Sequence, residues 1–353
     1  MPRRILIVRL SALGDIVHAV PVLAALRRHE PDAEIDWLVE EAYEPVLSLV
    51  DGLRHRVVVR AKSPGDSAIG TDAPRFPSGP AGYLAAARFL RRQSYDVALD
   101  LQGLIKSAVW ARVSGARSVI GFAAGHLREP QAAWLYHEQV TPPHPAHVIE
   151  KNLSLAAHLG APTAPFELPL RADMSAGVGE ELAQSIDGMA YAVLNPGAAW
   201  PNKRWPPDRF GAVAAALRQR HGLVTLVTWG PSERALAASI VAASEGAARL
   251  SPPTSVADLA ALMRGAALVV SGDTGPLHIA AAMGTPLVGL YGPTWPERNG
   301  PWNPADVVIS RAARCQCHHK RRCLIGAPCI ETIRVEEVID AADRRLAGGA
   351  RRP

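Results

Sequence analysis

The chain has 353 residues, of which 48% are hydrophobic and 20% are charged. This composition excludes a disordered or fibrous protein, and the length predicts two domains of ordinary size. The 38 basic and 33 acidic side chains give a net charge of +5 and are spread along the chain. Such a modest excess suits a phosphorylated small molecule or the anionic face of a membrane, whereas nucleic acid would call for a basic stripe and a recognisable binding module.

The first ten residues have the order of a signal peptide, because basic residues precede an apolar segment. Arg9 interrupts that segment and Asp15 follows it, so we interpret residues 5–10 as a first strand. No apolar run approaches the roughly 20 residues of a membrane-spanning helix. We therefore expect a cytoplasmic protein without a transmembrane segment.

Strand and helix patterns alternate in two series, separated by a segment rich in Pro, Ala and Thr at 160–169. The first series predicts strands at 5–10, 34–40, 57–60, 95–101 and 119–122, and helices that end near 28, span 83–92 and start after 104. The second predicts strands at 190–194, 223–228, 268–270 and 286–292, and helices at 207–220, 232–244, 255–264 and 276–283. The composition of 61–80 indicates a loop. The alternation predicts two α/β domains with parallel sheets, and a ligand cleft between them at the carboxyl ends of the strands.

The stretch from Leu268 to Gly292 reads as a strand, a glycine-rich turn, a short helix and a second strand. Pro276 lies in the first turn of the helix, where a missing N–H costs nothing. Such a turn directs backbone N–H groups and the positive end of the helix dipole at one point, which favours an anion. A well-capped structural unit explains the same pattern, so this stretch alone leaves both interpretations open.

Three further turns follow predicted strands. Asp15 lies in the first, where it is either a helix cap or a group that faces a ligand. The second, residues 195–206, joins a Pro-Gly turn to Lys203, a combination typical of a phosphate cradle or of an ordinary basic loop. In the third, Glu233 at a helix start could accept from ribose hydroxyl groups or complement the helix dipole.

All four cysteines of the chain, Cys315, Cys317, Cys323 and Cys329, lie within fifteen residues. A cytoplasmic protein is not expected to keep stable disulfides. Four clustered thiols could hold zinc, but the spacing C-x-C-x5-C-x5-C differs from a standard zinc knuckle. Reduced cysteines without metal are therefore our default interpretation.

Taken together, these stretches resemble the ADP-heptose:lipopolysaccharide heptosyltransferases, glycosyltransferase family 9. The resemblance covers almost the whole chain and includes six motifs in order, at 5–18, 35–41, 100–107, 128–130, 195–206 and 272–278. The motifs at 36–41 and 128–130 look most like heptosyltransferase I. The resemblance implies a GT-B fold with two doubly wound, Rossmann-like domains that face a central cleft. It implies an acceptor-binding domain at 1–165, a nucleotide-sugar-binding domain at 166–330, and a helix with a basic tail at 331–353 that packs back toward the first domain.

The resemblance also assigns roles. Asp15 would be the general base that takes the proton from the acceptor hydroxyl group. The donor ADP-heptose would contact Gly197, Ala198, Lys203, Glu233, Asp273, Thr274, Gly275 and His278. The acceptor, Kdo-lipid A at the cytoplasmic face of the inner membrane, would contact Arg60, Lys106 and Arg128. The family implies inversion in a single displacement, with no cofactor and no metal.

Alternatives remain within and outside this class. The chain could be a heptosyltransferase II or another sugar transferase that acts further out on the core. It could also be a nucleotide-sugar-binding protein without catalysis. An epimerase-like enzyme is disfavoured because the first strand is not followed by G-x-G-x-x-G. The loop at Ala198 lacks the paired threonines of some heptosyltransferase I enzymes, and no methionine at 252–254 is available to pack on adenine.

Overall fold

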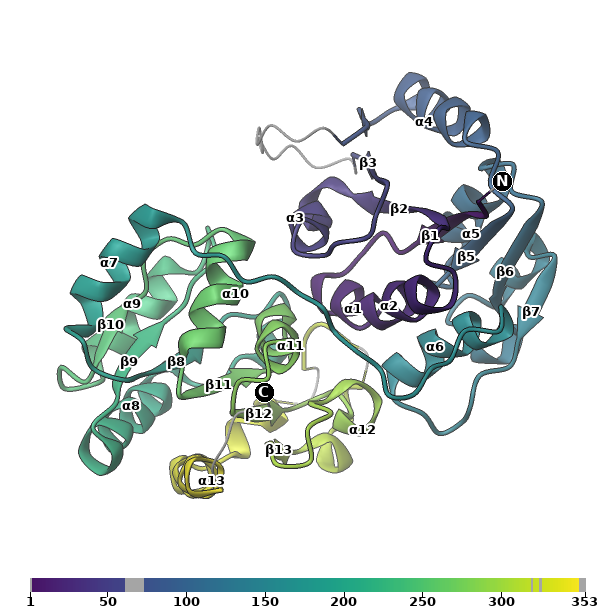
Figure 1. Ribbon diagram of the computed structural model, residues 1–353. Coiled ribbons are helices and arrows are strands. Elements are labelled where there is room, and N and C mark those ends of the chain that lie inside the picture. Colours follow the sequence, from purple (N-terminus) through teal and green to yellow (C-terminus); the bar gives the residue numbers. More distant parts are fainter. Residues whose placement is uncertain (1, 61–72, 319, 324–325, 349–353) are drawn as a thin grey trace. The chain divides into compact units, whose positions relative to one another are not determined.

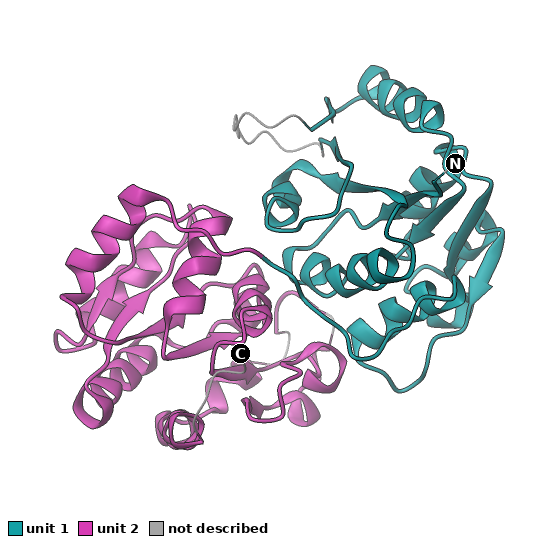
Figure 2. Ribbon diagram, viewed as in Figure 1, with its two compact units in different colours: residues 1–170 teal, residues 171–353 magenta. Residues whose placement is uncertain are grey.

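The computed structural model describes residues 2–60, 73–318, 320–323 and 326–348 (Figure 1). The chain forms two compact units, Met1–Leu170 and Arg171–Pro353 (Figure 2). Each unit is a parallel sheet covered by helices, as the alternating pattern predicts. Within the described ranges, no helix combines the length and apolarity needed to cross a bilayer.

The sheet of the first unit has the strand order β4-β3-β2-β1-β5-β6-β7, and every pairing is parallel. Its strands are β1 Arg4–Val8, β2 Glu34–Glu40, β3 His55–Val59, β4 Arg75–Phe76, β5 Val97–Asp100, β6 Ser118–Phe122 and β7 Glu138–Val140. Its helices are α1 Leu13–Val17, α2 Val20–His29, α3 Glu44–Leu47, α4 Pro80–Arg92, α5 Ile105–Val113 and α6 Val148–His158, with 3-10 turns η1 Glu41–Tyr43, η2 Ala124–His126 and η3 Pro130–Leu135. The short strand β4 falls in the predicted loop, and residues 61–72 of that loop lie outside the described residues.

Alternate residues of β1 face opposite sides of this sheet, as the two-residue period of a strand requires. Leu6 and Val8 join a buried cluster with α4 and α5. Helices α2 and α6 pack against each other, and Ile5 and Ile7 are also fully buried. Both faces of β1 are therefore covered, which explains its continuous run of apolar residues.

The sheet of the second unit has the order β10-β9-β8-β11-β12-β13, again with parallel pairings. Its strands are β8 Tyr191–Asn195, β9 Val224–Val227, β10 Ala248–Leu250, β11 Leu268–Gly272, β12 Leu287–Tyr291 and β13 Val307–Ser310. Its helices are α7 Ala176–Ile186, α8 Pro207–His221, α9 Arg234–Ala242, α10 Val256–Gly265, α11 Gly275–Ala282, α12 Pro296–Asn299 and α13 Val335–Ala347, with η4 Pro201–Lys203, η5 Ala312–Arg314 and η6 Cys329–Thr332.

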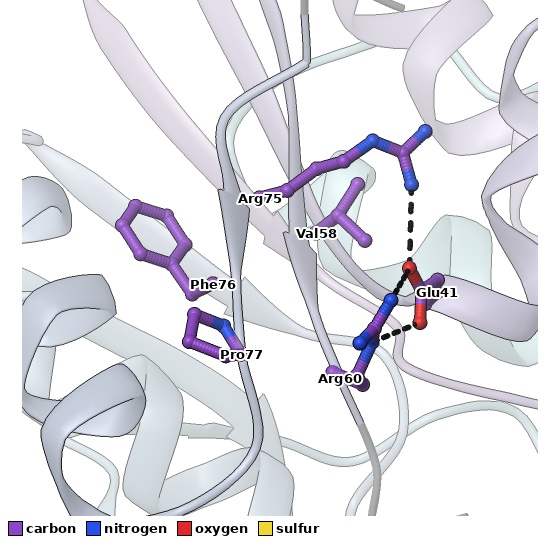
Figure 3. A pocket seen from close by; sticks show the side chains of 6 residues that line it. All are labelled: Glu41, Val58, Arg60, Arg75, Phe76 and Pro77. Carbon is purple, nitrogen blue, oxygen red and sulfur yellow. Dashed lines mark hydrogen bonds and ion pairs between the residues drawn. The ribbon is translucent and has the colours of Figure 1, made fainter. Parts of the chain in front are cut away.

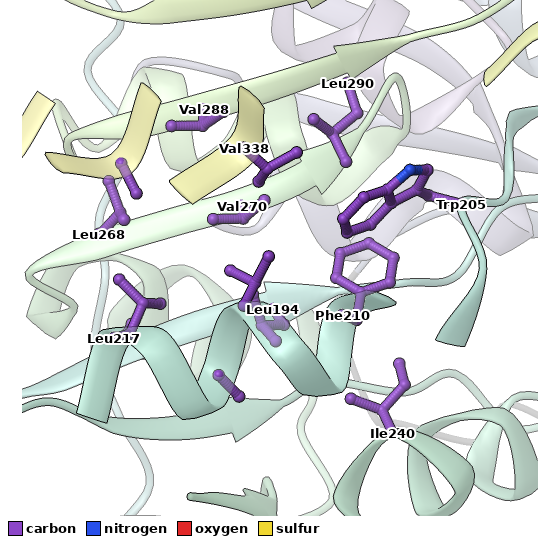
Figure 4. Close-up of a cluster of buried hydrophobic side chains, with 14 of the residues drawn as sticks. Leu194, Trp205, Phe210, Leu217, Ile240, Leu268, Val270, Val288, Leu290 and Val338 are labelled. Carbon is purple, nitrogen blue, oxygen red and sulfur yellow. The ribbon is translucent and has the colours of Figure 1, made fainter. Parts of the chain in front are cut away.

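Helix α13 packs on the second unit, against α8, β12 and β13. Val338 is fully buried in the same cluster as Trp205 and Phe210 (Figure 4). Ala341 and Ala342 belong to the same cluster and are also fully buried. These contacts assign α13 to the second unit, because its apolar face completes the core of the second sheet. The expected packing of 331–353 toward the first domain stays a prediction.

In both sheets the strand order reverses beside the first strand of the unit, between β1 and β5 and between β8 and β11. Helices leave such a point on opposite faces, so the carboxyl ends of the two strands open into a crevice where ligands bind. Asp15 follows β1, Lys203 follows β8, and Asp273 follows β11. The topology therefore places the predicted residues at the two positions where this fold class binds ligands.

Candidate active site

The side chain of Asn195, the last residue of β8, forms hydrogen bonds with residues at the ends of the neighbouring strands, at the reversal point of the second sheet. Its Nδ2 donates to Oγ of Ser271 and to Oγ1 of Thr274, each at 3.0 Å. Its Oδ1 accepts from Oγ1 of Thr228, which follows β9, at 3.1 Å. This network connects β8, β9 and β11 and fixes the start of α11.

The carboxylate of Asp273 contacts side chains from three segments of the second unit. Nζ of Lys203 lies 2.5 Å from its Oδ2, and Oγ1 of Thr294 donates to the same oxygen at 2.7 Å. Nδ2 of Asn299 donates to Oδ1 at 2.9 Å, and Nε2 of His278 lies 3.3 Å from that oxygen. Burial raises the pKa of Asp273, but His278 and Lys203 outweigh it, so the pKa lies well below its usual range. The carboxylate is therefore ionised and engaged by four side chains.

The first turn of α11 lies beside this ion pair. Thr274 is its N-cap, Pro276 in its first turn has no N–H, and the N–H of Leu277 donates to the carbonyl oxygen of Thr274 at 3.1 Å. This turn therefore offers an anion the N–H groups of Thr274 and Gly275 and the positive end of the helix dipole. A Cβ on Gly272 would lie 3.0 Å from the carbonyl oxygen of Lys203. Glycine therefore allows the loop of Lys203 to pack close to the carboxyl end of β11. An ammonium group and a helix start at one place can hold a diphosphate.

Glu233 lies at the start of α9 with its carboxylate against the loop after β8. Its Oε2 accepts from the backbone N–H of Gly230 at 3.1 Å. A Cβ on Gly197 would lie 2.1 Å from the same oxygen. Nε of Arg204 donates to the carbonyl oxygen of Ala198 at 2.8 Å. The loop after β8 that carries Gly197 and Ala198 thus lies against the carboxylate of Glu233.

Asp15 lies in α1, just past the carboxyl end of β1. Its Oδ1 lies 2.9 Å from NH2 of Arg9, and its Oδ2 accepts from the backbone N–H of Ala12 at 3.3 Å. Arg9 is buried and also donates to the carbonyl oxygen of Leu101. The carboxylate of Asp15 remains 39% exposed. It therefore has the contact of a helix cap and is still accessible to a ligand.

Arg60 follows β3 and forms two hydrogen bonds with Glu41, at 2.7 and 3.0 Å (Figure 3). NH1 of Arg75 lies 3.7 Å from the same carboxylate. The hydrogen bonds from Arg60 lower the pKa of Glu41. Together with Val58, Phe76 and Pro77, these residues line a small pocket of about 210 Å³.

Lys106 and Arg60 border a second, larger pocket of about 500 Å³. Nζ of Lys106 lies 2.7 Å from Oε1 of Glu40. Arg128 is exposed between η2 and η3 and does not line this pocket. The structure therefore groups two of the three predicted acceptor-binding side chains and leaves the third elsewhere in the unit.

The start of α5, which carries Lys106, is held by Asp100 at the end of β5. The buried carboxylate accepts from the backbone N–H of Gly103 at 3.1 Å, from Oγ of Ser107 at 2.9 Å, and from the hydroxyl group of Tyr136 at 2.7 Å. Burial raises the pKa of Asp100, while these hydrogen bonds oppose the shift. Asp100 thus has a structural role within the motif at 100–107.

Comparison with known proteins decides the family. The model of glycosyltransferase family 9 (heptosyltransferase) matches residues 83–327, more than half of the chain. The chain belongs to glycosyltransferase family 9. It is 29% identical to lipopolysaccharide heptosyltransferase 1 of Pseudomonas aeruginosa, over 91% of this chain and 87% of the relative. It is 28% identical to lipopolysaccharide heptosyltransferase 3 of Escherichia coli, over 94% and 95%.

Solved structures agree on the fold of this glycosyltransferase. A family 9 glycosyltransferase from Veillonella parvula superposes with a TM-score of 0.79 at 22% identity, over 98% of both chains. Escherichia coli heptosyltransferase WaaC with ADP gives a TM-score of 0.67 at 23% identity, over 98% of this chain and 99% of that one. The two Rossmann-like units are thus those of the GT-B fold, and the prediction of fold class is confirmed.

The cysteines of the glycosyltransferase are free thiols. Sγ of Cys317 lies 3.7 Å from Sγ of Cys323. Burial, together with the neighbouring Cys315, raises the pKa of Cys329 to about 12. Among the described residues, no group of three or more His, Cys, Asp or Glu side chains is arranged to hold a metal ion.

Sequence analysis does not identify three polar partners, Arg9 beside Asp15 in the first unit and Thr294 and Asn299 beside Asp273 in the second. Thr294 and Asn299 follow β12, whose carboxyl end lies at the same sheet edge as that of β11. Their position after a predicted strand was a usable signal, because polar residues there converge on one edge. In the sequence Arg9 is an interruption of an apolar run, whereas in the structure it is buried and paired with Asp15.

Proposed function

We propose that this glycosyltransferase transfers L-glycero-D-manno-heptose from ADP-heptose to a Kdo residue of the lipopolysaccharide inner core, with inversion and without a metal ion. The observation that carries the proposal is the cluster of Lys203, Asp273 and the start of α11 at the reversal point of the second sheet. That cluster combines a fixed ammonium group with a helix N-terminus, which suits a leaving diphosphate. The names of the similar proteins, lipopolysaccharide heptosyltransferase 1 and WaaC with ADP, support this donor and acceptor class.

Each of the candidate residues has a separate role in the transfer of heptose. Asp15 takes the proton from the acceptor hydroxyl group as its oxygen attacks the anomeric carbon, and the bond from that carbon to the diphosphate breaks in the same displacement. Lys203 and the backbone N–H groups of Thr274 and Gly275 hold the diphosphate as its charge grows. Glu233 accepts from ribose hydroxyl groups. His278 keeps Asp273 ionised and oriented, so that Lys203 stays in place.

We place the reaction at the cytoplasmic face of the inner membrane, where a lipid-linked acceptor is presented. The net charge of +5 supports attraction to an anionic surface. Arg60, Lys106 and Arg128 are cations of the first unit that suit the carboxylates and phosphates of such an acceptor.

A second candidate is transfer to a position further out on the core. The similarity to Escherichia coli heptosyltransferase 3 favours it, because at 28% identity it covers more of both chains than the similarity to the Pseudomonas enzyme. A binding protein without catalysis is the alternative outside the class.

The test is to incubate the purified protein with ADP-heptose and Kdo₂-lipid A in EDTA and to measure the mass of the product. A gain of one heptose is expected. Transfer only to an already heptosylated acceptor would support the second candidate, and binding of ADP-heptose without any product would support the binding protein. Activity that disappears in EDTA and returns with a metal ion would contradict the metal-independent mechanism.

A further inference from the structure

A pocket of about 500 Å³ opens between α4 and α5 in the first unit, a size typical of small-ligand sites. Its floor comes from the carboxyl ends of three adjacent strands, with Leu10 after β1, Glu40 in β2 and Val59 in β3. Asp15 follows β1 at the same edge of the sheet. The pocket therefore belongs to the edge that carries the proposed base.

The wall of the pocket is mostly apolar. Ala87 of α4 and Val109 and Val113 of α5 line it, together with Tyr83 and Trp110. The rings of that aromatic pair stack edge to face with their centroids 5.9 Å apart. A sugar needs hydrogen-bond partners for its hydroxyl groups when it leaves water, and this wall offers few. The wall instead suits a hydrocarbon chain.

The charged residues of the pocket are Glu40, Arg60 and Lys106. Each cation is paired with an acid, Lys106 with Glu40 and Arg60 with Glu41, so neither charge faces the apolar wall unpaired. Both paired cations keep about half of their side-chain surface exposed, 50% for Lys106 and 46% for Arg60, so an anionic head can still reach them from solvent. A site with an apolar wall and two such cations matches an amphiphile that has a hydrocarbon tail and an anionic head.

Apolar surface continues outside the pocket along the same two helices. Leu84 on α4 and Ile105 on α5 are 51% and 44% exposed, and Val109 at the pocket is 43% exposed. These are three of the five large apolar side chains that are exposed in the described part of the chain. Exposed apolar side chains are not needed to bind a sugar that is dissolved in water. They are suited to a ligand that comes from a lipid phase.

We infer that the pocket between α4 and α5 binds a fatty acyl chain of the lipid-linked acceptor. The inference rests on the proposed function, because it takes the acceptor to be a glycolipid. The acyl chain lies against Ala87, Val109 and Trp110, and the anionic saccharide lies toward Arg60 and Lys106, on the edge where Asp15 acts.

The test compares Kdo₂-lipid A with the same saccharide after complete removal of its acyl chains. Ala87→Phe fills the pocket, and Ala85→Phe on the exposed side of α4 is the matched control. Each methylene kept out of an apolar site lowers affinity about fourfold. We expect Ala87→Phe to raise the ratio of the two KM values, acylated to deacylated, roughly tenfold, with no change in this ratio for Ala85→Phe.

A direct binding measurement separates this inference from the proposed function. The fluorescent probe 11-(dansylamino)undecanoic acid should bind the wild-type protein and be displaced by Kdo₂-lipid A but not by the deacylated saccharide. An unchanged KM ratio and probe binding equal in both variants would overturn the inference. Displacement by phosphatidylglycerol vesicles as effective as by Kdo₂-lipid A would also overturn it, in favour of a membrane lipid. Probe binding without transfer to either acceptor would contradict the proposed function instead.

Discussion

Nζ of Lys203 lies 2.5 Å from Oδ2 of Asp273, and the same carboxylate also accepts from Thr294 and Asn299. An ionised carboxylate that is engaged in this way holds its donors in position and repels a diphosphate. We therefore propose that Asp273 positions Lys203 and the start of α11, and that Lys203 and backbone N–H groups contact the donor. This sharpens the role that resemblance alone gives to Asp273.

Lys203→Gln should lower kcat/KM for ADP-heptose by about 10²–10³, the usual loss when one preorganised group at a developing charge is removed. Glutamine keeps most of the side-chain length but not the charge. The measurement is steady-state kinetics with the donor varied. Lys320→Gln is the control, because that exposed lysine lies in a neighbouring loop. Equal kinetics for the two variants would remove Lys203 from the mechanism.

Asp273→Asn should destabilise the protein by about 3 kcal/mol at pH 7, since it leaves the ammonium of Lys203, whose side chain is only 15% exposed, without its partner. The folded-state pKa of Asp273 lies below its unfolded value, so the stabilisation is full above the unfolded pKa of about 4 and declines as the pH falls below it. Urea unfolding from pH 7 to pH 3 should show the difference from wild type shrinking below about pH 4. The exposed Asp340→Asn should show no such trend, and a difference that grows on acidification would contradict the assignment.

Asp15→Asn should reduce kcat by about 10²–10⁴, the contribution of a positioned general base. Asparagine can still occupy the place between Arg9 and the backbone N–H of Ala12, so the fold and ADP affinity should be retained. Rapid-quench turnover and calorimetric ADP titration measure the two quantities separately. Full turnover in the variant would leave Asp15 with the role of a helix cap only.

Gly197→Ala should weaken ADP binding by roughly tenfold, because the new Cβ would lie 2.1 Å from Oε2 of Glu233 and displace that carboxylate. The obstacle is the end of a flexible side chain, so we expect the fold to survive. ADP titration is the measurement. Gly177→Ala in α7 is the control, since its Cβ would meet nothing within 4 Å. Unchanged ADP affinity would place the ribose away from Glu233.

The alternation of strands and helices was enough to predict the fold class, because buried parallel strands such as β1 and β11 are continuous apolar runs. The edge strands β4, β7, β10 and β13 were not predicted, since each has only two to four residues, and only β13 is an apolar run. The loops that carry Lys203, Glu233 and Asp273 were predicted from turn chemistry at strand ends. The partners Arg9, Thr294 and Asn299 depend on tertiary packing, which spacing along the chain does not reveal.

A buried ion pair offers a test of how α13 is held on the second sheet. Nε of Arg345 lies 2.9 Å from Oδ1 of Asp306, which precedes β13, and both side chains are almost completely buried. Arg345→Met would leave the Asp306 carboxylate buried without its partner, so we expect a loss of about 3–5 kcal/mol in the free energy of unfolding. The exposed Arg344→Met on the same helix should cost less than about 0.5 kcal/mol.

The loss in Arg345→Met should depend on pH. Burial raises the pKa of Asp306 even when Arg345 is present, and removal of the arginine raises it further. A group whose folded-state pKa is raised binds its proton more tightly when folded, so the deficit of the variant should shrink as the pH falls from 7 toward 4. Urea denaturation of both variants at several pH values measures this trend. A deficit that is small at pH 7, or constant across the range, would contradict a role for this ion pair in holding α13 on the sheet.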